Sequence, residues 1–68
     1  MKQILIEIAN ILWKVPNIDE TSVAVIMNPI DTMEQAQRLL KYLQENKDNK
    51  EIMKMGYLLK HNHEIIGN

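Results

Sequence analysis

The first quarter of the chain is unusually apolar. Only three of the twelve positions 4–15 are polar, namely Glu7, Asn10 and Lys14. At roughly 100° per residue, a helix gathers most of the apolar positions on one stripe and leaves Ile6 and Trp13 outside it. The stripe consists of Ile4, Leu5, Ile8, Ile11, Leu12 and Val15. This pattern predicts a helix that buries one face and still has apolar side chains on its back.

Pro16 is expected to end this first helix. Proline donates no backbone hydrogen bond and disfavours helical geometry at the preceding Val15. The predicted helix therefore runs from about Lys2 to Lys14. A lysine in the last turn also suits the negative end of the helix dipole.

A second helical pattern begins near Asp31. Either Asp31 with Glu34 or Thr32 with Gln35 has the spacing of a capping box, in which two side chains satisfy the free amides of a first turn. Apolar residues then recur at helical spacing, at Met33, Ala36, Leu39, Leu40 and Leu43. We predict an amphipathic helix here.

The capping spacing recurs at Asp48 and Glu51 and predicts a third helix that begins at about residues 48–49. Its expected apolar stripe is Ile52, Met55, Leu59 and Ile66. Only residues 46–49 would then separate the last two helices, and so short a connection makes them antiparallel neighbours. Gly56 would lie inside the third helix, where glycine costs about 1 kcal/mol, so a close packing contact is expected there.

Residues 16–30 have two interpretations. Asp19 can cap a short helix over about 20–27. Alternatively, the continuous apolar run at 23–27 favours a buried strand, which would need a pairing strand from a second molecule. We favour the helix, and Pro29 then turns the chain into the next one.

Together these elements predict a single all-α domain over residues 1–68. It is a small three- to four-helix bundle with a C-terminal antiparallel helical hairpin, on which the first helix packs; the alternative is an α+β fold with a short strand at about 22–27. The chain is 46% hydrophobic and 25% charged, which is typical of a soluble globular domain. Its length lies near the lower limit for a single apolar core.

The absence of cysteine excludes disulfides and thiolate metal sites and favours a reducing, cytoplasmic setting. Lys2 before an apolar run resembles the start of a signal peptide. However, Glu7 and Asn10 interrupt the run, and no small-residue cleavage pattern follows before Pro16. The run is also shorter than the roughly 20 apolar residues that span a bilayer. We expect no membrane partner.

Little in the sequence points to catalysis or metal binding. Thr21 and Ser22 have no context of an activated nucleophile, and no glycine-rich phosphate loop occurs, so we expect neither an enzyme nor a cofactor. His61, His63 and Glu64 resemble a metal site, but histidines two apart point to different sides of a helix. We expect no metal there, and a partly buried packing role for His63.

The remaining candidate function is protein binding. Ile6 and Trp13 lie on the back of the first helix, and Met53 and Tyr57 lie on a flank of the last. Tryptophan and tyrosine are typical anchors of interfaces. We predict a small non-enzymatic interaction module that forms a homodimer or docks on a larger protein. The competing interpretation is that residues 18–30 cover Ile6 and Trp13 within the same chain.

The alternative function is a small helical DNA-binding regulator. Its candidate contacts are the basic residues of the last two helices, namely Arg38, Lys41, Lys47, Lys50, Lys54 and Lys60. Residues 35–68 carry a formal charge of +2 and residues 1–34 carry −3, for a net charge of −1. Acidic residues are interspersed among the bases, and the turn at 45–49 lacks the glycine common in helix-turn-helix motifs. Nucleic acid is therefore the second choice.

Overall fold

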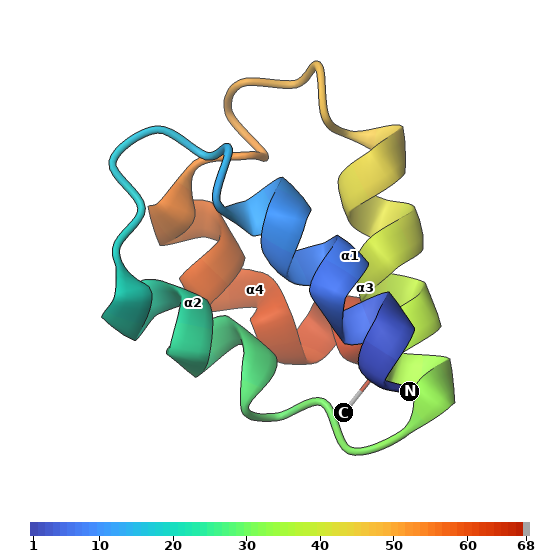
Figure 1. Ribbon diagram of the computed structural model, residues 1–68. Helices are drawn as coiled ribbons and strands as arrows, with labels where there is room; N and C mark the ends of the chain where they lie inside the picture. The colour runs from blue at the N-terminus through green and yellow to red at the C-terminus, as the bar shows by residue number, and fades with distance from the viewer. Residues whose placement is uncertain (68) are drawn as a thin grey trace.

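Four α-helices form the fold in the computed structural model, which describes residues 1–67 (Figure 1). They are α1 (Lys2–Leu12), α2 (Glu20–Met27), α3 (Met33–Glu45) and α4 (Met55–Ile66). The predicted small all-α bundle is confirmed. The alternative strand at about 22–27 is wrong, because those residues belong to α2 and no strand occurs within residues 1–67.

The starts of α2 and α3 follow from local capping. The Asp19 carboxylate accepts a hydrogen bond from the Ser22 amide at 2.7 Å and so begins α2. At α3 the Thr32 hydroxyl accepts from the Gln35 amide at 3.2 Å, and the Gln35 side chain accepts from the Thr32 amide at 3.1 Å. Of the two capping pairs that the sequence allows there, Thr32 with Gln35 is the one that forms.

The first helix is shorter than predicted and ends at Leu12. Beyond it the chain tightens into turns, in which the Lys14 amide donates to the Ile11 carbonyl at 3.1 Å. Lys14 therefore lies outside the last turn of α1. Asn17 then adopts a positive φ of 61°, a conformation that asparagine tolerates better than most residues.

The last helix starts later than predicted, at Met55 instead of residues 48–49. Residues 49–53 form a separate helical turn, in which the Asn49 side-chain oxygen caps the amides of Glu51 at 3.2 Å and Ile52 at 3.3 Å and the Asn49 carbonyl accepts from the Met53 amide at 3.0 Å. The extended backbone of Lys54, with a ψ of 144°, ends this turn before α4 begins. Gly56 is consequently the second residue of α4, not an interior one, and a Cβ there would meet nothing within 4 Å. The expected packing contact at Gly56 is absent.

The buried face of α4 also differs from the predicted stripe. Leu58 is 1% exposed, whereas Leu59 is 37% exposed. The buried residues of this helix are Leu58, Asn62 and Ile66. The buried face of α4 is rotated relative to the predicted stripe because α4 packs against α2 as well as α3.

The helices pack as a closed ring in the order α1, α3, α4, α2 and back to α1. The last two helices run in opposite directions, as predicted for a hairpin (Figure 1). However, α1 packs on α3 and α2 and lies diagonally across from α4, so it covers only one helix of that hairpin. The centre of the ring is filled by fully buried side chains, namely Ile8, Leu12, Ile26, Leu39, Leu43, Leu58 and Ile66.

Two side chains each donate a hydrogen bond to a carbonyl near the end of a neighbouring helix. The Asn62 amide nitrogen donates to the Ile26 carbonyl near the end of α2 at 3.0 Å. The Arg38 guanidinium donates to the Ile66 carbonyl at the end of α4 at 3.0 Å. The last carbonyls of a helix lack partners within it. Each of these side chains therefore satisfies a carbonyl and fixes α4 to a neighbour.

Candidate interaction surface

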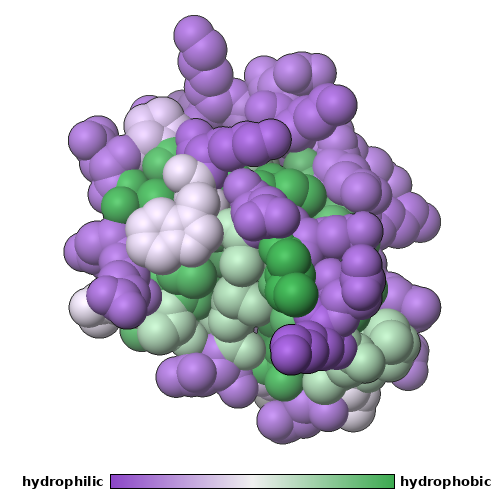
Figure 2. Space-filling view, in the orientation of Figure 1, coloured by the Kyte–Doolittle hydropathy of each residue, from purple (hydrophilic) through white to green (hydrophobic). Residues whose placement is uncertain are grey.

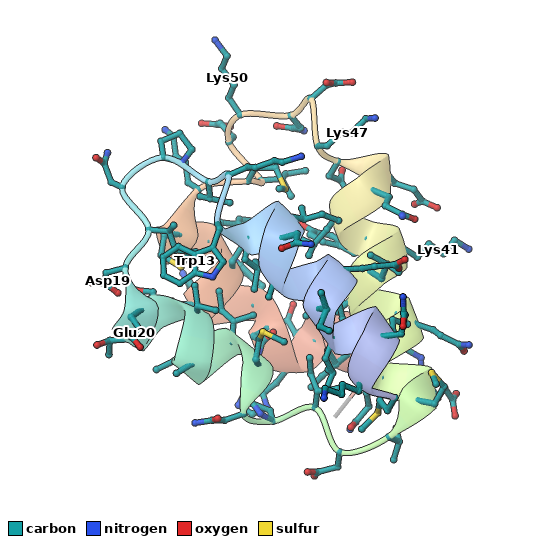
Figure 3. All side chains as sticks on the ribbon, in the orientation of Figure 1. Trp13, Asp19, Glu20, Lys41, Lys47 and Lys50 are labelled. Carbon is teal, nitrogen blue, oxygen red and sulfur yellow. The ribbon has the colours of Figure 1, made fainter. Side chains whose placement is uncertain are left out.

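The outward face of α1 carries two exposed apolar side chains. Ile6 and Trp13 are seven residues apart, so they lie on the same side of the helix axis, two turns from each other. Each is 51% exposed. The Trp13 side chain projects from the end of α1 (Figure 3). Residues 18–30 thus leave about half of each side chain uncovered.

The other two predicted interface residues lie elsewhere. Met53 is in the connection between α3 and α4, where it is partly buried against the core. Tyr57 is on α4, diagonally across from α1, and its ring centroid lies 4.3 Å from that of His61. The structure therefore keeps Ile6 and Trp13 together as one surface. Tyr57 belongs to another side of the bundle.

A buried phenol lies beside Tyr57. Within residues 1–67, the Tyr42 hydroxyl is buried and has no hydrogen-bond partner. Burial raises the pKa of Tyr42 above its ordinary value, and the nearby Tyr57 phenol raises it further. Tyr42 lies on α3, where it is partly buried and packs against the core.

The two histidines of α4 differ in exposure. His61 is partly buried, and its Nδ1 lies 3.3 Å from a Glu64 carboxylate oxygen. His63 is exposed, so the expected partly buried role belongs to His61 instead. Among the described residues, no three side chains of histidine, aspartate or glutamate come together as a metal site would require.

A groove of about 690 Å³ opens at one end of the bundle. It lies where the turn after α1 meets the connection between α3 and α4. Its apolar lining consists of Ile11, Val15, Pro16, Met53 and Met55, and its polar lining of Lys14, Asn17, Lys47, Lys50 and Lys54. Sequence reasoning missed this site, because Lys14 is more than 30 residues from the other three lysines of the groove and no local spacing connects them.

The structure places several of the basic residues outside the last two helices. Lys47 and Lys50 project from the connection between α3 and α4 (Figure 3), and Lys54 immediately precedes α4, so none of the three lies within a helix. Lys41, in contrast, pairs with Glu45 on α3 at 3.9 Å. The expected row of bases on the last two helices is thus divided. A recognition helix with a continuous basic face is not what the fold presents.

Comparison of the chain with models of protein families, with curated proteins and with solved structures finds no match. Among residues 1–67, no helix combines the length and hydrophobicity needed to cross a membrane. Two surface features are candidates for function. They are the outward face of α1 and the lysine-lined groove.

Proposed function

We propose that this protein is a small, non-enzymatic interaction module of the cytoplasm that forms a homodimer through the outward face of α1. The observation that supports this is the exposure of Ile6 in α1 and of Trp13 immediately after it, 51% each, on one side of the helix axis. Tryptophan brings a large apolar area to a contact at low entropic cost and is enriched among binding anchors. Exposed apolar side chains that gather on one face are typical of interaction sites, and this supports the proposal.

The partner that we propose for this face is a second copy of the chain. In a two-fold dimer the same surface contributes from both molecules, so an antiparallel pair of α1 helices sets Ile6 of each copy against Trp13 of the other. The net charge of −1 gives little repulsion between copies. A standard interface takes about 800 Å² from each partner. The chain exposes 4630 Å², so such an interface would leave most of its surface free.

Sedimentation equilibrium across a wide concentration range tests the proposal. We expect the native chain to rise from the mass of one chain, 8.0 kDa, toward twice that mass. An Ile6→Ser, Trp13→Ala double variant should keep its helical circular dichroism and remain at the mass of one chain. The matched control is Val25→Ser with Met33→Ser, which removes apolar side chains of similar exposure from α2 and α3. This control should still dimerise.

Three outcomes would contradict the homodimer or its location on α1. A native chain that remains at the lower mass at every concentration would rule out the homodimer. A double variant that dimerises like the native chain would place the interface elsewhere. Loss of dimerisation in the Val25→Ser, Met33→Ser control as well would show that α1 is not the docking face.

A further inference from the structure

The groove at the end of the bundle combines an apolar floor with a rim of one charge sign. Four of the eight basic residues of the chain line it, namely Lys14, Lys47, Lys50 and Lys54. Within residues 1–67 none of these four forms a salt bridge. Asp48 and Glu51 lie in the same connection but do not line the groove. The positive charge of the rim is therefore available to a ligand.

The start of α4 adds to this charge. Lys54 and Met55, where the helix begins, both line the groove, and no side chain caps this terminus. The first amides of a helix lack partners within it and attract anions. An anion among these lysines would therefore lie at the positive end of α4.

The opposite helix end does not cancel this attraction. The carboxyl end of α1 also reaches the groove, through Ile11. Its carbonyls already accept hydrogen bonds, because the Lys14 amide donates to Ile11 and the Val15 amide donates to Leu12. Lys14 itself carries a positive charge to this end.

We propose that this groove binds a small amphiphile, in which a carboxylate or phosphate head is joined to an aliphatic tail. The head would lie among the lysines and the first amides of α4, and the tail on the apolar floor. Figure 2 shows this end of the molecule as hydrophilic side chains with apolar surface between them. Met53 and Met55 suit a flexible tail because their own side chains adapt in shape.

The size of the groove favours a small molecule over a protein segment. Its volume of about 690 Å³ lies within the range of roughly 300–1,000 Å³ that small-molecule sites occupy. Stable protein interfaces instead use about 20–30 residues on each side. Ten residues line the groove, and neither Ile6 nor Trp13 is among them. The inference is therefore independent of the homodimer.

Titration of the full chain with dodecanoate, below its micelle-forming concentration, tests the site. With methyl-labelled methionine, we expect nuclear magnetic resonance shifts at Met53 and Met55 and none at Met27 or Met33, which do not line the groove. Dodecyl phosphate should cause the same shifts. Dodecyltrimethylammonium, with the same tail and a positive head, should not.

Charge reversal supplies the matched variants. Lys14→Glu with Lys54→Glu should weaken dodecanoate binding by about tenfold or more, since hydrogen bonds to a charged group are lost. Lys41→Glu with Lys60→Glu changes the net charge equally outside the groove and should leave the affinity within about twofold. The Ile6→Ser, Trp13→Ala variant should bind like the native chain, which separates this test from that of the dimer.

Three results would overturn the proposal. Equal binding of the cationic amphiphile, or equal shifts at Met27 and Met33, would indicate non-specific apolar adsorption. Unchanged affinity after reversal of Lys14 and Lys54 would remove the lysine rim from the site. A glutamate-rich peptide that shifts Met53 and Met55 at lower concentration than dodecanoate would make the groove a peptide site instead.

Discussion

At the scale of single residues, polar side chains do much of the positioning in this small protein. Asn62 is buried on α4 and satisfies a carbonyl of α2, while its own Oδ1 has no partner within residues 1–67. A buried amide that is half satisfied is costly, and the bond that it does form offsets part of that cost. That bond fixes the end of α2 against α4.

Replacement of Asn62 by alanine should therefore destabilise the fold. The Ile26 carbonyl would lose its partner, and we expect the free energy of unfolding to fall by about 1–3 kcal/mol. Urea denaturation measures this change. Gln37→Ala at an exposed position of α3 is the control and should stay within about 0.5 kcal/mol. Equal stability of the two variants would contradict a positioning role for Asn62.

Asp19 makes the stability of α2 depend on pH. The Ser22 amide, as a hydrogen-bond donor, holds the pKa of this carboxyl below its ordinary value of 3.8. Its folded-state pKa is lower than its unfolded-state pKa, so its contribution is complete above the unfolded value and is lost as the pH falls through the folded value. We expect stability to decline in that acidic range.

Urea midpoints measured from neutral pH down to strong acid test this expectation. Asp19→Asn keeps a capping oxygen without a titrating group, so this part of the pH dependence should disappear. Asp19→Ala should be less stable than Asp19→Asn at neutral pH. An unchanged acid profile in Asp19→Asn would assign the dependence to other carboxyls.

At the scale of elements, the sequence predicts helices well where one local signal acts alone. Asp19 before α2, and Thr32 with Gln35 before α3, both form the bonds that their spacing indicates. Before α4 the side chain of Asn49 caps a separate turn through the amides of Glu51 and Ile52, and the extended backbone of Lys54 divides that turn from the helix. Leu58 and not Leu59 faces the core because α4 packs against α2 as well as α3, which local spacing does not indicate.

The two glycines of the chain, one at the start of α4 and one just after its end, should respond differently to substitution by alanine. Gly56 lies in open space in the first turn, so Gly56→Ala should stabilise the protein by about 0.4–1 kcal/mol through the unfolded chain. Gly67 has a φ of 76° beside Arg38, so Gly67→Ala should destabilise it by about 1–2 kcal/mol. Thermal unfolding resolves both, since 1 kcal/mol shifts the midpoint by about 4–8 °C in a domain of this size. A loss of stability in Gly56→Ala would show that this glycine has a packing role after all.

At the scale of the whole molecule, the arrangement of helices exceeds what local spacing can predict. The sequence indicates which residues are apolar but not that α1 meets α2 and α3 while avoiding α4. The groove illustrates the same limit, because Lys14 and Lys50 become neighbours only when two separate turns meet. The exposed face of α1 could be predicted, since Ile6 and Trp13 fall outside its apolar stripe.

Self-association through α1 should also appear in thermal stability. A dimer that binds only the folded chain raises the unfolding midpoint as protein concentration rises. We expect this dependence in the native protein and its absence in the Ile6→Ser, Trp13→Ala variant. Differential scanning calorimetry over a concentration series measures it. A native midpoint that does not change with concentration would contradict the homodimer.

The ring of helices has a consequence for how the chain could be divided. Its sequence neighbours, α1 with α2 and α3 with α4, are opposite sides of the ring, and the other two sides join them. Six of the eleven buried apolar residues come from residues 1–30 and five from the remainder, so neither half holds a core alone. The molecule is in effect two helical hairpins that complement each other within one chain. Cut near Pro29, the two pieces should each be unfolded and should recover the fold only as a pair.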